Sequence, residues 1–284
     1  MTSSLSSHIH HPAAAVDDEE EEEEEEETSL FPDPIHPSSD NPPESPSPAY
    51  HHYRLPSVDA TVTIRLLPSQ GLSFQLWPSS LSLLSSLSSP LSYLLPFSSP
   101  HHRPLRILEL GSGAGLVGIS YAAALGAHAT ITDLPHVLPN LLYNVDLNSS
   151  VLRESGGEVS VAQLRWGEIE DVEKVGREFD LVLAADVVYY DYLYEPLLKT
   201  LKWLFEGKGR DEMVFVMGHV RRWKKDNLFF RKARKWFDVE VLRTDRESHP
   251  GSRSGVIVYR FSCKAQHPSI ALSSDVNGVS ESVH

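Results

Sequence analysis

Residues 109–118 form a glycine-rich stretch, ELGSGAGLVG, that overlaps the end of the short β-rich run RILEL at 106–110. A strand-like run that ends in closely spaced glycines and continues into a helical pattern is typical of the first strand, turn and helix of a nucleotide-binding α/β fold. Two interpretations of the glycines compete. The G-x-G-x-x-G of a dinucleotide site would use Gly113, Gly115 and Gly118. The E-h-G-x-G-x-G of an S-adenosylmethionine site would use Glu109, Gly111, Gly113 and Gly115.

The position of the strand end favours the second interpretation. A dinucleotide fold places its first glycine directly after the strand and a third glycine where the helix packs on that strand. Because the strand ends at Gly111, the third position is occupied by Leu116. A register that starts at Gly113 would instead put a glycine inside the strand, where it weakens pairing. Asp133, at the end of the next predicted strand, could accept the ribose hydroxyls of either ligand.

Charge is distributed unevenly over the 284 residues. Residues 1–50 hold fourteen acidic residues, eight prolines and no Lys or Arg, so the formal net charge of −14 lies there. A like-charged, Pro-rich segment cannot bury enough apolar surface to offset its ordering entropy. We expect a disordered acidic tail over 1–50, one folded domain over 51–263 and a disordered C-terminal tail over 264–284. The acidic tail could compete with substrate for the basic segment Arg221–Lys235, or it could serve solubility alone.

The sequence also bears on location and metal binding. The Ser-rich start lacks the apolar core of a secretory signal, and no apolar stretch reaches membrane-spanning length. A single cysteine, Cys263, excludes an internal disulfide and fits a reducing compartment. We expect a cytoplasmic or nuclear monomer that does not enter a membrane. We expect no metal site, because the paired histidines lack Cys or carboxylate partners at ligand spacing. These histidines are His51, His52, His101 and His102.

Short β-rich runs alternate with helical patterns, which predicts an α/β domain whose mostly parallel sheet is covered on both faces. The predicted strands are 106–110, 129–133, 159–166, 179–186 and 213–219. The predicted helices are 79–95 after Pro78, 115–126, 134–147, 194–205 and the basic 222–236. Residues 237–243 and 255–263 predict an antiparallel C-terminal hairpin with a connection at His249–Gly251. Residues 58–67 and 72–77 predict a second, smaller hairpin.

Four further stretches accompany the glycines. They are QLWPSS (75–80), ITDLP (131–135), LRWGE (164–168) and LVLAADVVYY (181–190). Together with ELGSGAGLVGI, they resemble methyltransferase family 16, the seven-strand S-adenosylmethionine-dependent protein-lysine methyltransferases. The resemblance covers about Leu72–Val241 and includes Arg221 and Asp226–Phe229, whereas nothing upstream of Val58 matches. It implies a Rossmann-like, seven-stranded class I methyltransferase fold with strand order 3-2-1-4-5-7-6 and an antiparallel seventh strand.

The resemblance also implies a cofactor, a partner and a set of site residues. The cofactor would be S-adenosyl-L-methionine, and the partner a protein that offers a lysine side chain. Cofactor contacts would come from Trp77, Glu109, Gly111, Ser112, Gly113, Asp133, Trp166 and Ala185. The D-x-x-Y of the family falls on Asp186 and Tyr189, which are the implied catalytic residues. Both lie at the carboxyl end of the fourth predicted strand, where open α/β sheets bind ligands.

The chemistry assigns roles to the two implied catalytic residues. Methyl transfer from a sulfonium is an in-line displacement, so the enzyme mainly aligns donor and acceptor and excludes water. The acceptor amine must be neutral, whereas a free lysine has a pKa of about 10.4. A desolvated aromatic wall made of Tyr189 with Tyr190 or Tyr192 would disfavour the ammonium form. Asp186 would orient the nitrogen by accepting its hydrogen bond. Its negative charge would, however, favour the ammonium form of the lysine and so oppose the effect of the aromatic wall on the lysine pKa.

Alternative roles exist for the individual residues. Trp77 and Trp166 could be core aromatics, Asp186 could cap a helix, and Tyr189 could pack on the sheet. On the predicted helix 134–147 and just after it, Asn144 and Asn148 are expected to be surface residues. The basic side chains of Arg221–Lys235 could form a solvated helix face.

Alternative functions also exist on related folds. A nucleic-acid or small-molecule N-methyltransferase shares the fold, but the sequence after the fourth strand lacks the prolines of an N/D-P-P-Y/F turn. Without its tail the chain is neutral, which argues against a nucleic-acid partner. A NAD-dependent oxidoreductase would require a glycine in place of Leu116. A non-catalytic binding module would be expected to have lost the glycines or Asp133.

Overall fold

The computed structural model describes residues 47–95, 103–206, 213–245 and 255–264. Most of the expected acidic tail, the expected C-terminal tail after Lys264 and the connection at His249–Gly251 lie outside the described residues. None of the described helices is long and apolar enough to span a bilayer.

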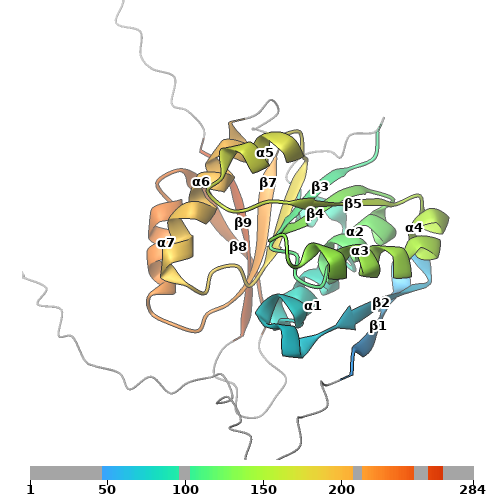
Figure 1. Cartoon of the computed structure of the whole chain (residues 1–284). Helices are drawn as coiled ribbons and strands as arrows, with labels where there is room; N and C mark the ends of the chain where they lie inside the picture. The colour runs from blue at the N-terminus through green and yellow to red at the C-terminus, as the bar shows by residue number, and fades with distance from the viewer. Residues whose placement is uncertain (1–46, 96–102, 207–212, 246–254, 265–284) are drawn as a thin grey trace, which may run out of the picture. The chain divides into compact units, whose positions relative to one another are not determined.

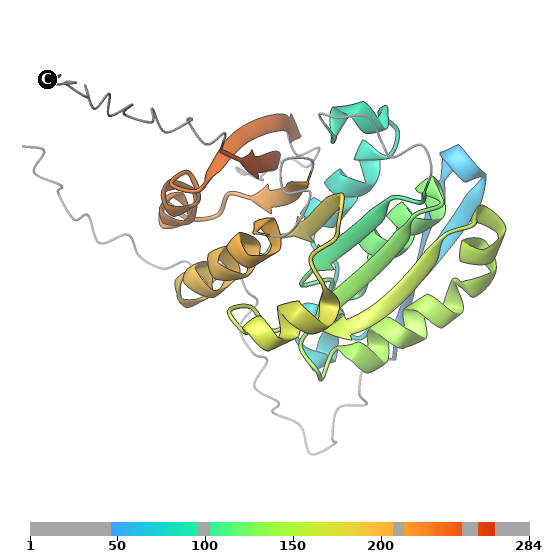
Figure 2. The same cartoon turned by 90° about the horizontal axis from the view of Figure 1, so that it is seen from above.

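A seven-stranded sheet forms the centre of the domain (Figures 1 and 2). Its strands are β3 (Arg106–Leu110), β4 (His128–Asp133), β5 (Glu158–Gln163), β6 (Leu181–Ala185), β7 (Val214–Val220), β8 (Phe237–Asp245) and β9 (Val256–Cys263). They are arranged in the order β5-β4-β3-β6-β7-β9-β8. Five neighbouring strands are parallel, and β9 is antiparallel to both β7 and β8. The predicted class I fold, its strand order and its antiparallel C-terminal hairpin are confirmed.

The central strands are apolar at successive positions because both of their faces are covered. In β3, Ile107 belongs to one hydrophobic cluster, and Leu108 and Leu110 belong to the other. In β6, Leu181 belongs to the first of these clusters and Val182 to the second. Figure 2 shows the helices on the two sides of the sheet. The site residues at the strand ends therefore belong to a sheet that is held rigid by hydrophobic packing on both faces.

Helices cover each face. One side carries α1 (Pro78–Ser86), α2 (Leu116–Leu125), α3 (Leu138–Leu147) and α4 (Ser149–Ser155). The other side carries α5 (Ile169–Val175), α6 (Tyr194–Phe205) and α7 (Asp226–Ala233). Neither α4 nor α5 was predicted, since segments of seven residues are too short to show a helical period.

Three helices are shorter than predicted, of which α3 begins at Leu138 instead of residue 134. The helix after Pro78 ends at Ser86 instead of residue 95, because Pro90 cannot continue a helix and is followed by a short 3-10 turn at Leu91–Tyr93. The basic helix begins at Asp226 instead of residue 222. Residues 222–225 form a turn instead, in which the carboxylate of Asp226 accepts the backbone N–H groups of Arg222 and Trp223.

For the upstream hairpin, the sequence predicted the wrong partner strand. Strand β2 (Ala60–Leu66) pairs with β1 (Ala49–Leu55), whereas Leu72–Phe74 is a short 3-10 helix. Five of the seven residues of β1 are polar or aromatic, AYHHYRL, and most are exposed, so the segment lacks the apolar run by which a strand is recognised. Strand β1 also begins two residues before the expected domain start at residue 51.

Three asparagines of α3 and its C-terminus bind the hairpin to the domain. Asn148 accepts the N–H of Thr63 at 2.8 Å and donates to its carbonyl at 2.8 Å. Asn144 accepts the N–H of Arg65 at 2.9 Å and donates to its carbonyl at 3.1 Å. Asn140 accepts from Nε of Arg65 at 3.0 Å. The spacing of four residues places the amides on one side of the helix, where they bind the β2 backbone as a further strand would.

The expectation that Asn144 and Asn148 are surface residues is therefore wrong. Their exposed fractions are 0% and 1%. Asn144 also donates to the carbonyl of Ala114, 2.9 Å away, and Ala114 lies inside the glycine turn. The contact connects the hairpin, α3 and the turn after β3.

Candidate active site

The glycine turn follows β3. Gly111, Gly113 and Gly115 have φ angles of +62°, +55° and +85°, a region that glycine adopts without strain. Gly118 lies within α2, and a Cβ added there would approach Cγ2 of Ile131 to 2.2 Å. The first three glycines thus shape the turn, and the fourth allows α2 to pack on the sheet. This arrangement supports the register that starts at Gly111.

Glu109 and Ser112 brace this turn. Oε2 of Glu109 accepts the N–H of Gly118 at 2.9 Å, which fixes the first turn of α2. Burial raises the pKa of Glu109 to about 8, because the charged carboxylate would be desolvated. Oγ of Ser112 accepts the N–H of Thr132 at 3.0 Å, and the hydroxyl of Thr132 donates to the carbonyl of Glu109 at 2.7 Å. These contacts join the ends of β3 and β4.

Asp133 closes the turn from the end of β4. Its Oδ2 accepts the N–H of Gly113 at 2.8 Å, and its Oδ1 accepts the N–H of Leu134 at 2.7 Å. Its exposed fraction is 7%, and this burial raises the pKa of its carboxyl. The two predicted cofactor residues Gly113 and Asp133 are therefore in direct contact.

Two segments from elsewhere in the chain lie against the turn. A Cβ added to Gly111 would approach Cζ2 of Trp166 to 3.0 Å, so the indole packs on the glycine. A Cβ added to Gly113 would approach the carbonyl oxygen of Ser73 to 3.0 Å. The indole Nε1 of Trp77 donates to the carbonyl of Leu72 at 3.2 Å, which orients the ring at the start of α1.

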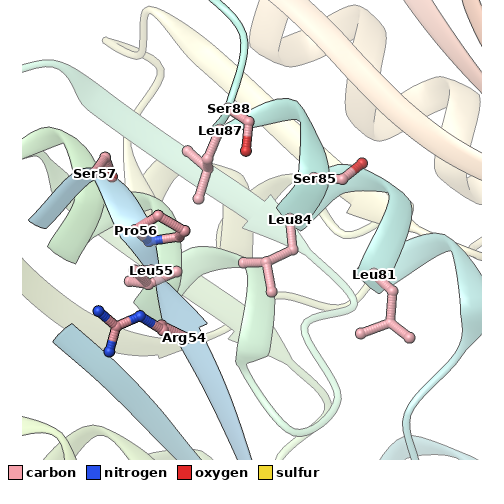
Figure 3. Close-up of a pocket in the computed structure, with 9 residues that line it drawn as sticks. All are labelled: Arg54, Leu55, Pro56, Ser57, Leu81, Leu84, Ser85, Leu87 and Ser88. Atoms are coloured by element: carbon pink, nitrogen blue, oxygen red, sulfur yellow. The ribbon is translucent and has the colours of Figure 1, made fainter. Parts of the chain in front are cut away.

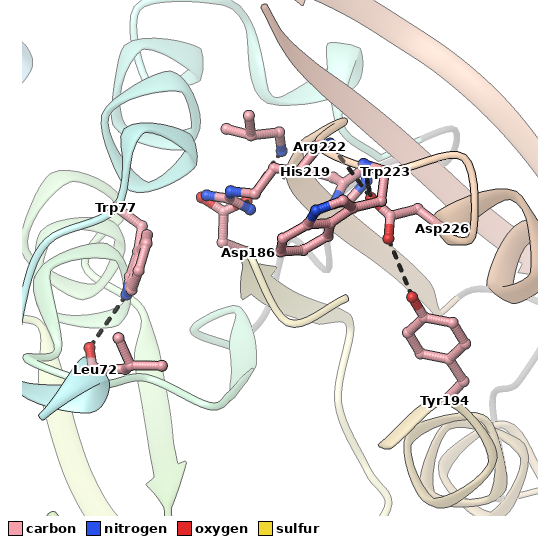
Figure 4. Close-up of polar contacts among 9 residues, drawn as sticks. Leu72, Trp77, Asp186, Tyr194, His219, Arg222, Trp223 and Asp226 are labelled. Atoms are coloured by element: carbon pink, nitrogen blue, oxygen red, sulfur yellow. Dashed lines mark hydrogen bonds and ion pairs between the residues drawn. The ribbon is translucent and has the colours of Figure 1, made fainter. Parts of the chain in front are cut away.

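Asp186 has an unusual backbone and an unusual environment. Its φ is +55°, a left-handed conformation that is strained for a residue other than glycine. Oδ1 accepts the N–H of Val220 at 2.9 Å and is 3.1 Å from Nη1 of Arg222 (Figure 4). Oδ2 is buried and has no hydrogen-bond partner among the residues that the structure describes. A buried carboxylate oxygen without a partner marks a place where a ligand can donate a hydrogen bond.

A row of tyrosines follows Asp186. The rings of Tyr189 and Tyr190 are 4.8 Å apart, and those of Tyr190 and Tyr192 are stacked at 5.3 Å. Tyr189 is half-buried, and Tyr192 is 68% exposed, so the row runs from the interior to the surface. Burial, followed by the charge of Asp133, raises the pKa of Tyr189 to about 12. Tyr189 is therefore a neutral phenol at physiological pH.

All predicted site residues lie in β3, in the segment before α1, or at the carboxyl ends of β3 to β6. Ala185 ends β6 and pairs with Gly218 of the neighbouring strand. The fold thus brings together residues that are more than a hundred positions apart in the sequence.

Sequence reasoning missed the role of the segment after β7. Arg222 was expected on a helix face, yet it contacts Asp186. His219 at the end of β7 is fully buried, and its Nε2 is 3.4 Å from Oδ2 of Asp226. The hydroxyl of Tyr194 donates to Oδ1 of Asp226 at 3.1 Å. The available signal was positional, since residues after the fifth strand share an edge with Asp186.

A separate cavity of about 590 Å³ lies between the hairpin and α1 (Figure 3). Its lining is Arg54, Leu55, Pro56, Ser57, Leu81, Leu84, Ser85, Leu87 and Ser88. It contains none of the predicted site residues. Within the described part of the chain, His, Cys, Asp and Glu side chains form no group of three that could hold a metal ion.

The strand order, the glycine turn after β3 and the acidic residue at the end of β4 are those of a class I methyltransferase fold. The family follows from comparison with known proteins. A family model described as lysine methyltransferase matches residues 58–236, and the chain belongs to this family.

Individual relatives agree with the family. The zebrafish (Danio rerio) protein N-lysine methyltransferase METTL21A is 39% identical over 155 residues, which are 55% of this chain and 65% of that protein. The EEF1A lysine methyltransferase 3 of Xenopus tropicalis is 29% identical over 197 residues, 69% of this chain and 80% of that protein. The mouse (Mus musculus) EEF1A lysine methyltransferase 3 is 32% identical over 178 residues, 62% and 69% of the two chains. The chain spans less than two thirds of the length of the zebrafish relative.

Proposed function

We propose that this chain transfers a methyl group from S-adenosyl-L-methionine to the side-chain amine of a lysine in a protein. The observation that carries the proposal is the buried, unpartnered Oδ2 of Asp186 beside a row of tyrosines, at the sheet edge that also holds the glycine turn. Membership of the lysine methyltransferase family supports it.

The donor side of the site fits S-adenosylmethionine. Gly111 and Gly113 adopt the positive φ angles of the turn, and Trp166 and Ser73 pack where their Cβ atoms would lie, so the turn that faces the ligand is tightly held. The carboxylate of Asp133 uses two of its roughly four acceptor positions on backbone N–H groups, which leaves capacity for two ribose hydroxyls. The remaining donor contacts that we propose come from Trp77, Glu109, Ser112, Trp166 and Ala185. When bound, the cofactor supplies a methyl group on a positively charged sulfur.

The acceptor side would be formed by Asp186 and Tyr189. Oδ2 of Asp186 accepts a hydrogen bond from the lysine nitrogen and directs its lone pair toward the donor. The ring of Tyr189, continued by Tyr190 and Tyr192, replaces water around the aliphatic part of the lysine. Because the phenol of Tyr189 stays neutral, it adds no charge that would favour the ammonium form.

The test is methylation with a tritiated donor. The purified full-length protein is incubated with tritiated S-adenosylmethionine and a desalted cell lysate, and the labelled band and residue are identified by mass spectrometry. We expect a labelled lysine in a protein, with label reduced at least tenfold by Asp186→Asn. Asp191→Asn, an exposed carboxylate five residues further on, is the matched control and should retain activity. Label that is confined to nucleic acid, or to another kind of side chain, would overturn the proposal.

A further inference from the structure

Asp186 poses an electrostatic problem for methyl transfer. A carboxylate next to a lysine nitrogen favours the ammonium form, which has no lone pair to attack the methyl group. A residue that orients the amine by a hydrogen bond would thus also reduce the fraction of reactive amine. The structure contains a group that opposes this effect.

That group is the guanidinium of Arg222. Its Nη1 is 3.1 Å from Oδ1 of Asp186, and the side chains of the two residues are only 15% and 2% exposed. Its Cζ lies 5.4 Å from the ring centroid of Trp77, on the side of the donor residues. Salt screens an ion pair this far withdrawn from water less than it screens an exposed pair, so the charge of the arginine acts on the groups beside it.

We propose that Arg222 is a positioning residue that neutralises the charge of Asp186, so that Asp186 can orient the acceptor amine without favouring its ammonium form. This inference rests on the function proposed above. It assigns separate tasks to the two carboxylate oxygens. Oδ1 receives Arg222 and the N–H of Val220, and Oδ2 stays available for the acceptor.

The chemistry of a guanidinium suits this task. It remains charged at every pH at which the enzyme works and has no acceptor atom, so it cannot itself hold the lysine nitrogen. Its positive charge repels an ammonium and leaves a neutral amine unaffected. Replacing it by a neutral side chain would therefore leave Asp186 unopposed and lower the fraction of neutral acceptor at a given pH.

The backbone of Arg222 is held by a second carboxylate. Asp226, at the first turn of α7, accepts the N–H groups of Arg222 and Trp223 at 3.4 and 3.3 Å. The hydroxyl of Tyr194 from α6 donates to its other oxygen. Figure 4 shows Tyr194 and Asp226 from two helices together with Arg222 and Asp186. The turn that carries Arg222 is thus fixed from the side opposite to Asp186.

Other ionisable groups surround this pair, but none of them bonds to the carboxylate of Asp186 among the described residues. His219 of β7 faces Asp226, with 3.4 Å between Nε2 and Oδ2. Tyr194 bonds to Asp226 as well. The charge of Asp133, at the end of β4, raises the pKa of Tyr189. From β9, Tyr259 lies within electrostatic range of Arg221, Arg234 and Asp226. Among the described residues, Arg222 is the charged side chain that the structure shows bonded to the carboxylate of Asp186.

The inference predicts opposite shifts for two single variants. The probe is the protein identified in the lysate experiment, and kcat for its methylation at saturating substrate is measured from pH 6.5 to 10, because kcat reports the ionisation of the bound lysine. In Arg222→Gln the rise of kcat with pH should move about one unit toward alkaline pH, a tenfold loss on the acid side that disappears at high pH. In Asp186→Asn the profile should move toward acid pH, with a lower plateau, because the arginine is then unopposed.

Further variants separate charge from structure. The double variant Asp186→Asn with Arg222→Gln should return the profile to within about 0.3 units of the wild type, since neither charge remains. Arg222→Lys keeps the charge and should keep the position of the profile even if its plateau falls. Arg106→Gln is the matched control, because Arg106 pairs with Glu178 at the opposite end of the sheet. Affinity for S-adenosylhomocysteine, measured by calorimetry, should stay within threefold in all variants and reports correct folding.

The outcomes distinguish this inference from the proposed function. If no protein lysine is labelled, or if Asp186→Asn has full activity and an unchanged profile, the proposed function itself fails. If Asp186→Asn loses activity while Arg222→Gln keeps the wild-type pH profile, the function stands and the inference about Arg222 is wrong. It is equally wrong if Arg222→Gln lowers activity by the same factor at every pH, because a purely structural role would do that.

Discussion

Asn144→Ala is the substitution for which the structure gives the most definite expectation. The side chain of Asn144 is fully buried and makes three hydrogen bonds to backbone groups. The substitution removes the partner of the N–H of Arg65 and of the carbonyl of Ala114. The carbonyl of Arg65 keeps only a long contact of 3.4 Å with Asn140.

The magnitude follows from these groups. A buried backbone group that loses its partner costs about 1 to 3 kcal/mol. With two groups left unpaired and a third weakened, we expect a loss of about 3 kcal/mol in the free energy of unfolding. For a domain of this size, about 2 to 4 °C of melting temperature is lost per kcal/mol, so the midpoint should fall by roughly 6 to 12 °C.

Urea and thermal unfolding followed by circular dichroism measure the effect. Asn227→Ala on α7 replaces an exposed asparagine and should change stability by less than about 0.5 kcal/mol. Asn148→Ala should destabilise the domain but leave the affinity for S-adenosylhomocysteine unchanged, because Asn148 does not contact the glycine turn. Asn144→Ala should reduce both quantities. A loss of stability below 1 kcal/mol for Asn144→Ala would refute the view that the asparagines hold the hairpin.

Three further predictions concern the glycine turn. Gly118→Ala should destabilise the domain by at least about 3 kcal/mol, because the new Cβ would lie 2.2 Å from Cγ2 of Ile131. The control is Gly156→Ala, whose new Cβ meets nothing within 4 Å and which should cost about 1 to 2 kcal/mol because its φ is positive. The pKa of Glu109 rises from its ordinary 4.5 to about 8 on folding, so folding takes up a proton between these values and stability falls as pH rises through that window. The side chain of the Glu109→Gln variant stays neutral, so the stability of the variant relative to the wild type should increase from pH 5 to 8 and level off above pH 8. An equal dependence of unfolding free energy on pH in the two proteins would contradict this. Asp133→Ala should weaken S-adenosylhomocysteine binding by about 1.5 to 3 kcal/mol in calorimetry, and an unchanged affinity would remove Asp133 from the cofactor site.

The sheet could be predicted from the sequence because its strands are buried on both faces. A continuous apolar run such as LVLAA at 181–185 has few alternatives to a central parallel strand, and the predicted strand bounds agree with the structure to within about three residues. The hairpin at the start of the domain could not be predicted in this way. Strand β1 is exposed and polar, and β2 is completed by the asparagines of α3, about eighty residues away in the sequence.

The candidate site was predictable where local sequence determines the chemistry. The three glycines with positive φ and the acidic residue at the end of β4 follow from short motifs, because each motif lies at the end of a single strand. The contact between Arg222 and Asp186 was not predictable. It depends on a turn that precedes α7, and the basic composition of 221–235 favoured a longer helix instead.

The backbone of Asp186 explains why this position needs support from so many neighbours. A left-handed conformation at an aspartate is strained and persists only where the surroundings overdetermine it. Here its N–H donates to the carbonyl of Gly218, and its Oδ1 receives both the N–H of Val220 and the guanidinium of Arg222. These three contacts all come from β7 and the turn after it, so the geometry of Asp186 is set by the neighbouring strand as well as by its own. A substitution in that turn can therefore alter the acceptor side of the site without touching the donor residues at β3 and β4.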